Sequence, residues 1–179
     1  MKSFVCNWLL TAVVPAGDSY SAFSQGQLLI ALISTVLIVV CVLIHYEVLN
    51  KLSTWLAQMR HLHRTRVLVL ILGLLAAHVV EIWIYAVAFG LLDGVADFGR
   101  ITHLQVPDPG SHWLDYVYYS FVTYTTVGYG DIVPVGPIRF IAAAEALNGW
   151  LLLGWSVSFT FLEMQRFWRE PAEHMTKHH

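Results

Sequence analysis

Three long apolar runs constrain this 179-residue chain more than any other feature. They cover residues 27–49, 67–92 and 138–163, and the shortest of them has 23 residues. At 1.5 Å per residue, 23 helical residues extend over about 34 Å, enough to cross a hydrocarbon core of roughly 30 Å. Only 12% of the residues are charged, too few to cover three apolar helices in water. The sequence therefore predicts an all-α integral membrane protein with three transmembrane helices surrounded by a lipid bilayer.

The charge balance and the cysteine content argue against other classes of protein. Ten Lys and Arg residues stand against 12 Asp and Glu residues, so the basic surplus of a nucleic-acid-binding protein is missing. An apolar content of 57% is too high for a disordered chain. Cys6 and Cys41 are too few for a disulfide scaffold. We expect no nucleic-acid partner.

Basic residues predict the orientation of the three helices. Residues 50–66 carry four Lys and Arg side chains, whereas residues 93–112 carry only Arg100. Because short Lys- and Arg-rich loops stay in the cytoplasm, residues 50–66 are predicted to be a basic cytoplasmic loop. Residues 164–179 then form a cytoplasmic tail and residues 1–26 an extracytoplasmic segment, in a multi-pass protein of the cell membrane, plasma or inner. Within that segment, residues 1–16 loosely match a secretory signal, so cleavage and an interfacial segment are both open.

A further apolar segment, residues 113–134, is interrupted by Gly128 and Gly130 and does not suit a fourth span. Because the flanking spans place both of its ends outside, it must enter and leave the membrane from the same side. The string TTVGYGD occupies residues 125–131. Carbonyl oxygens can replace the water around a cation if they all face one axis, and this requires alternate residues in conformations that glycine tolerates. Such backbone is stable at membrane depth where it lines water.

This string, the re-entrant segment before it and the spanning helix on each side resemble the tetrameric potassium channels. The resemblance covers residues 67–166 and implies a K⁺-selective channel that is not an enzyme, with K⁺ ions in a selectivity filter and no organic cofactor. One pore segment per chain implies a homotetramer. The helix at 27–49 is additional to the two-helix pore. The implied pore domain, residues 67–163, comprises an outer helix at 67–92, a re-entrant pore helix at 113–125, a filter at 126–130 and an inner helix at 138–163.

The resemblance also assigns roles within the filter. It implies that K⁺ is bound by the carbonyl oxygens of Thr126, Val127, Gly128 and Tyr129 and by the Thr126 hydroxyl, with Gly130 completing the filter. The pore helix is expected to direct the negative end of its dipole toward these ions.

Residues around the filter are expected to support it. In many family members a Trp at the position of Tyr118 hydrogen-bonds the acid after the filter, so we expect a bond from the Tyr118 hydroxyl to Asp131. Aromatic packing is the alternative for Tyr118. Thr125 joins the pore helix to the filter. Val122 stands where some members carry a filter-supporting Glu, so that carboxylate is absent here.

The inner helix contains candidates for a gate. Gly149 matches the family's hinge position if the preceding connection is one residue shorter, and Gly154 competes with it. Close helix packing is the alternative for both glycines. Leu153, Val157 and Phe161 fall near one helix face and either gate the pore by dewetting or face neighbouring helices or lipid.

Ionisable residues inside the spans suggest a further site. His78 and Glu81 share a helix face, and Glu145 lies at a similar depth in the inner helix, so the three are expected to meet. A structural clamp, a proton sensor and a metal site of unknown identity all stay open. A second set near the cytoplasmic helix ends is expected to form ion pairs, namely His45, Glu47, Glu163 and Arg166.

Regulation and selectivity leave alternatives. No span carries Arg at every third position, so we expect no voltage-sensor gating, and any regulatory subunit is unknown. The filter string is also compatible with a weakly selective cation channel. A membrane metalloenzyme built on His78, Glu81 and Glu145, with His45 as a further candidate ligand, is a remote alternative, because it leaves the filter string unexplained.

Overall fold

The computed structural model describes residues 25–58, 63–95, 98–104 and 112–176. Three of its helices are long and apolar enough to cross a membrane, over Gly26–Gln58, Thr65–Leu92 and Arg139–Arg166. The prediction of a multi-pass membrane protein with three spanning helices is therefore confirmed. The elements in chain order are α2 (Gln25–Gln58), α3 (His63–Leu92), β1 (Arg100–His103), α4 (Trp113–Tyr124), β2 (Ile132–Val135) and α5 (Arg139–Thr176).

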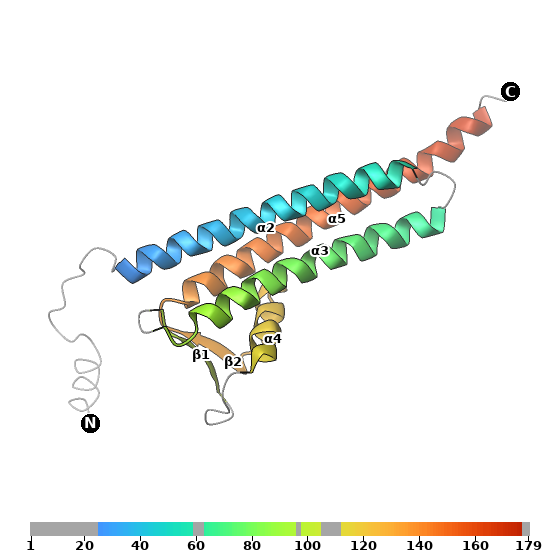
Figure 1. The fold of residues 1–179 in the computed structure, drawn as a ribbon. Coiled ribbons are helices and arrows are strands. Elements are labelled where there is room, and N and C mark those ends of the chain that lie inside the picture. The colour runs from blue at the N-terminus through green and yellow to red at the C-terminus, as the bar shows by residue number, and fades with distance from the viewer. Residues whose placement is uncertain (1–24, 59–62, 96–97, 105–111, 177–179) are drawn as a thin grey trace, which may run out of the picture.

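The three long helices lie side by side, and α4 and the two strands gather at one end of them (Figure 1). That end holds the start of α2, the end of α3 and the start of α5, while the end of α2, the start of α3 and the end of α5 lie at the opposite end (Figure 1). The segment that contains α4 therefore starts and ends at the same end of the three long helices, and its re-entry into the membrane stays a prediction. The predicted extracytoplasmic segment falls almost entirely on residues 1–24, which lie outside the described residues.

Three helices extend beyond the bounds that the sequence predicts for them. Residues 50–58 and 63–66, expected to belong to a loop, are helical, and residues 164–176, expected to form a tail, continue α5. The prediction was wrong because hydropathy marks the part of a helix that lies in lipid. Lys, Gln and Glu are good helix formers, so a charged segment extends a helix without extending the span.

A small sheet corrects the all-α prediction. β1 and β2 pair antiparallel, with Arg100 opposite Val135 and His103 opposite Ile132. The Leu104 N–H extends this pairing by bonding the Asp131 carbonyl oxygen at 2.9 Å. Each strand has only four residues, too few to produce a visible alternation of apolar and polar residues. The sheet ties the segment before the pore helix to the segment after the filter.

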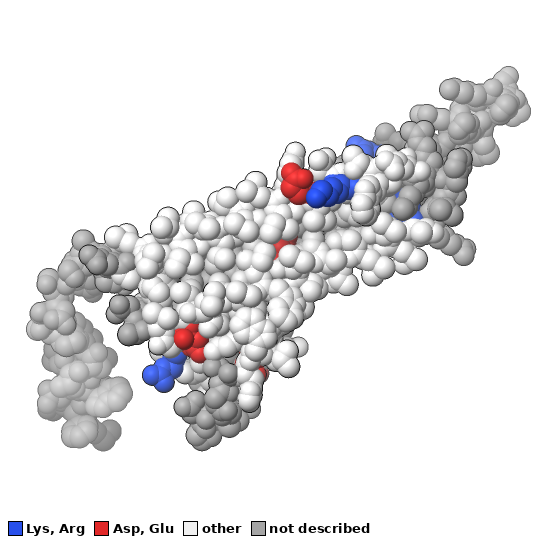
Figure 2. Space-filling view, in the orientation of Figure 1, with Lys and Arg blue, Asp and Glu red and all other residues white. Residues whose placement is uncertain are grey.

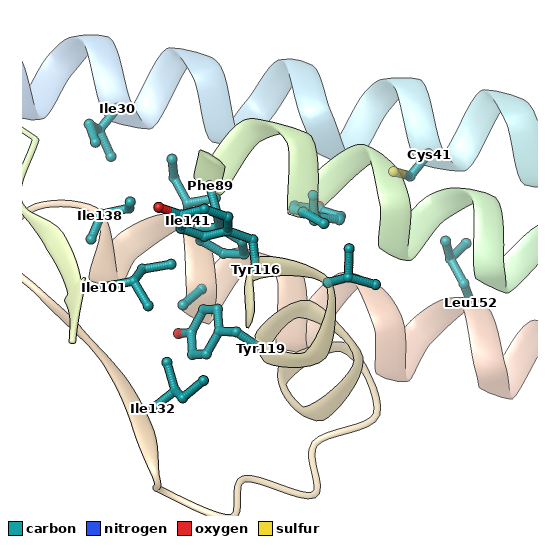
Figure 3. Close-up of a cluster of buried hydrophobic side chains, with 14 residues drawn as sticks. Ile30, Cys41, Phe89, Ile101, Tyr116, Tyr119, Ile132, Ile138, Ile141 and Leu152 are labelled. Atoms are coloured by element: carbon teal, nitrogen blue, oxygen red, sulfur yellow. The ribbon is translucent and has the colours of Figure 1, made fainter. Parts of the chain in front are cut away.

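The main hydrophobic core receives side chains from all six elements or their ends (Figure 3). Its buried members include Ile30 of α2, Phe89 of α3, Ile101 of β1, Tyr119 of α4 and Ile141 of α5, and the rings of Phe89 and Tyr119 lie 5.0 Å apart. Because α4 packs against both α3 and α5, and α2 packs against those same two helices, this core fixes the position of α4. On the face that Figure 2 shows, the described parts of the three long helices carry few charged side chains, as expected for a surface that meets lipid or other subunits.

Candidate ion-conduction site

The pore helix α4 has well-defined ends. At its start, the Asp115 carboxylate accepts a hydrogen bond of 2.8 Å from the His112 backbone N–H, and an acidic group in a first turn suits the helix dipole. At its end, Tyr124 is the last helical residue and Thr125 is the C-cap. The Thr125 hydroxyl donates to the Phe121 carbonyl oxygen at 2.7 Å. The helix is thus one residue shorter than expected, and Thr125 closes it.

The filter backbone alternates in conformation. Thr126, Gly128 and Gly130 have positive φ angles of 59°, 58° and 79°, whereas Val127 and Tyr129 between them do not. This alternation turns successive carbonyl groups toward the same side of the strand. Left-handed backbone at the two glycines agrees with the sequence argument. The sequence did not predict the positive φ of Thr126, because threonine rarely adopts this conformation and its residue type therefore does not indicate it.

Backbone bonds hold the start of the filter against the pore helix. The Val122 carbonyl oxygen accepts from the Val127 N–H at 3.0 Å and from the Gly128 N–H at 3.3 Å. A Cβ at Gly128 or Gly130 would have nothing within 4 Å, so these positions need glycine for its backbone conformation and not for space. The Tyr129 side chain is 72% exposed, so this segment lies at the edge of the single chain.

At the outer side, the Tyr118 hydroxyl donates a hydrogen bond of 3.0 Å to the Asp131 carboxylate. This is the bond that the sequence predicts, although Tyr118 is 39% exposed. Two causes raise the pKa of Tyr118: partial desolvation, which is the larger, and the hydrogen bond to Asp131. The raised pKa keeps the hydroxyl protonated, so that it can donate this bond. That this bond supports the filter stays a prediction.

Behind the filter, the pore helix contacts two buried carboxylates. The Tyr124 hydroxyl bonds Glu81 of α3, and the Ser120 hydroxyl contacts both Glu145 of α5 and the Ile82 carbonyl oxygen. All four of these side chains are fully buried or nearly so. The pore helix is thus held from behind by polar groups of both the outer and the inner helix.

Of the three residues expected to lie together, His78 and Glu81 are in contact, but Glu145 is not part of their group. Glu81 bonds His78 at 3.3 Å and His45 of α2 at 2.9 Å, while Glu145 contacts Ser120 instead. Similar depth along two helices does not place two side chains on facing sides, because the rotation of each helix decides that.

His45 was expected among the ion pairs near the helix ends, yet it is fully buried between the helices. Its burial could have been predicted from its position in an apolar run, four residues after the buried Cys41 and so on the same helix face. Of the expected ion-pair set, Glu163 does bond Arg166 at 2.8 Å, and it also bonds Arg66 at 3.5 Å. Among the described residues, no ion pair joins the remaining member, Glu47, to Glu163 or Arg166.

The two candidate hinge glycines differ in their surroundings. A Cβ at Gly149 would lie 2.2 Å from the Tyr124 carbonyl oxygen, whereas one at Gly154 would meet nothing within 4 Å. Gly149 thus permits close contact between α5 and the end of the pore helix, which favours the packing alternative. Val157 and Phe161 are 70% and 59% exposed, and Leu153 is partly buried. Their pore-lining role stays a prediction.

Comparison with known proteins identifies the domain that contains this site. A family model described as "Ion channel" matches residues 67–166, more than half of the chain. Among curated proteins, Protein LctB of Geobacillus stearothermophilus is 44% identical over 52 residues, which are 29% of this chain and 39% of that protein. Protein LctB of Bacillus caldotenax is 50% identical over 38 residues, 21% of this chain and 28% of that protein.

The matched segments cover well under half of each relative, and the name LctB states no activity. No solved structure matches the chain significantly. The family match coincides with the outer helix, the pore helix, the filter segment and the membrane part of the inner helix. The chain therefore belongs to the ion channel family, whose members conduct ions passively.

Proposed function

We propose that this protein is a K⁺-selective channel whose filter comprises residues 126–130. The alternation of positive φ at Thr126, Gly128 and Gly130 is the observation that carries the proposal. It orients consecutive carbonyl oxygens toward one side, where they form the oxygen ligands that a dehydrated K⁺ ion needs. The proposed ligands are the carbonyls of residues 126–129 and the Thr126 hydroxyl.

The functional unit in this proposal is a homotetramer in the cell membrane. One chain supplies one filter strand, which cannot surround an ion, and four strands around an axis form complete rings of carbonyls. The exposed Val127 and Tyr129 side chains support this proposal, because they are available to contact adjacent subunits. Exposed apolar residues on α5, including Val157 and Phe161, are available for the same packing or for lining the inner pore.

Proteoliposomes test conduction and selectivity together. Purified protein should carry K⁺ down its gradient far faster than Na⁺, and Ba²⁺, a K⁺-sized dication, should block the flux. Gly128→Ala should abolish K⁺ selectivity, because alanine disfavours positive φ. Gly154→Ala is the matched control, since its Cβ meets nothing within 4 Å.

The outcomes separate the alternatives. Equal Na⁺ and K⁺ flux with intact Ba²⁺ sensitivity would replace selective conduction by a weakly selective cation channel. Absence of flux from folded protein would overturn the proposal. Native mass spectrometry tests assembly, and a dominant species of four 20.2 kDa chains is the expected result.

A further inference from the structure

A buried polar cluster lies behind the filter and has no part in carbonyl-based ion conduction. Its members come from four different helices: His45 of α2, His78 and Glu81 of α3, Tyr124 of α4 and Ser156 of α5. All five side chains are buried. A polar cluster at this depth is costly unless it is fully compensated. We call these five residues the inter-helix cluster.

The inter-helix cluster has more contacts than polar hydrogens. Both imidazoles contact the Glu81 carboxylate through Nδ1 and the Ser156 hydroxyl through Nε2. The Tyr124 hydroxyl contacts both Glu81 and His78. With neutral imidazoles and an ionised Glu81, each of the four partner residues brings one hydrogen, whereas these contacts number six. Two of the six contacts therefore have no hydrogen of their own, so that two lone pairs face each other there.

A metal ion resolves this deficit better than a proton does. One added proton fills one contact, whereas a cation between the two Nδ1 atoms and the carboxylate accepts several lone pairs at once. Both imidazoles can then carry their hydrogen on Nε2 and donate it to Ser156, whose oxygen has two lone pairs for the contacts of 3.0 and 3.1 Å. Metal-binding imidazoles normally donate their second ring N–H in this way.

The donor atoms are already close enough for coordination. One ligand atom each of His45, His78 and Glu81 lies within 4.8 Å of the others, and the Nδ1-to-carboxylate distances are 2.9 and 3.3 Å. Ligands about 2.0–2.2 Å from a tetrahedral zinc ion are roughly 3.3–3.6 Å apart. Side-chain adjustments of about 1 Å therefore suffice to hold an ion.

We propose that His45, His78 and Glu81 bind a divalent transition-metal ion of the zinc type, with the Tyr124 hydroxyl as fourth ligand and Ser156 orienting both imidazoles. Two imidazoles, a carboxylate and a phenol suit such an ion, and the ionised Glu81 offsets one of its two positive charges. The site gives the additional helix α2 a function, because His45 supplies one ligand. It also lies next to the filter, since Tyr124 is two residues before Thr126.

Metal binding to the full-length protein tests this site directly. The protein, carried on an affinity tag without histidine, is treated with a chelator, equilibrated with Zn²⁺ or Co²⁺, and analysed for bound metal. We expect one ion per chain, with the visible absorption of tetrahedral cobalt. His45→Asn and Glu81→Gln should each weaken binding more than tenfold, and Ser156→Ala should weaken it about 10–100-fold, the usual range for a group that orients a ligand.

His112→Asn is the matched control, because this exposed histidine lies outside the inter-helix cluster. It should leave the metal content unchanged, and circular dichroism should show that each variant is folded. Wild-type protein without a tightly bound ion would overturn the proposal, as would full binding by both His45→Asn and Glu81→Gln. Since the readout is bound metal, failure here leaves K⁺ conduction untouched, and failure of conduction leaves the metal result intact.

Discussion

Two tyrosines of the same short helix make the same kind of bond in opposite surroundings. Tyr124 donates to Glu81 behind the filter, where both side chains are fully buried. Tyr118 donates to Asp131 at the outer side, where it is partly exposed. Loss of the outer bond leaves both groups accessible to water, whereas loss of the inner one leaves a buried carboxylate short of a partner. Burial, and not bond type, should therefore decide what each contributes to stability.

Replacement of the acceptors should produce the largest contrast between the two bonds. Glu81→Ala leaves two buried histidines and a hydroxyl without their shared partner, and we expect a loss of about 3–5 kcal/mol in the free energy of unfolding. Asp131→Ala, the matched variant at the outer side, should cost far less because water reaches Tyr118. Unfolding of metal-free protein in detergent measures both. Equal losses would contradict the importance of burial.

Crowding at the buried end of the pore helix should have the next largest effect. Gly149→Ala places a methyl group against the Tyr124 carbonyl oxygen and should destabilise the protein by about 1–3 kcal/mol. Gly154→Ala, five residues further along α5, should be neutral or slightly stabilising because alanine is a better helix former. Thermal unfolding of the two variants provides the comparison. If Gly154→Ala were the more harmful, Gly149 would not be the packing contact inferred here.

Removal of the inner hydroxyl alone isolates the buried bond. Tyr124→Phe keeps the ring but deprives Glu81 and His78 of a partner, so we expect a loss of about 1–3 kcal/mol. Denaturant unfolding measures this loss. In the double variant with Glu81→Ala, the effect of Tyr124→Phe should largely disappear. Additive losses would mean that Tyr124 and Glu81 act independently.

Removal of the outer hydroxyl should have the smallest effect on unfolding. Tyr118→Phe loses an exposed bond that water replaces. If the bond holds the filter in place, the variant should instead recover less K⁺ flux than the wild type after incubation in low K⁺. Unchanged recovery would leave Tyr118 with the packing role that the sequence also allows.

The sequence predicted correctly those features of the molecule that depend on residues close together in the chain. The three spans follow from runs of apolar residues, and the left-handed filter positions at Gly128 and Gly130 follow from residue type. The bond between Tyr118 and Asp131 joins residues only 13 apart, within one re-entrant segment. In contrast, β1 and β2 are separated in the chain by the whole of α4. Neither four-residue strand contains a pattern from which its partner could be predicted.

The sequence by itself determined a multi-pass channel protein with left-handed backbone at Gly128 and Gly130, because hydropathy and glycine placement act over short stretches of chain. Only the tertiary structure decided that His45 joins His78 and Glu81, that Glu145 does not, and that Gly149 packs against Tyr124. These contacts depend on how each long helix is rotated about its axis and aligned with its neighbours. That choice comes from packing of the whole bundle, and a single helix's sequence leaves it open.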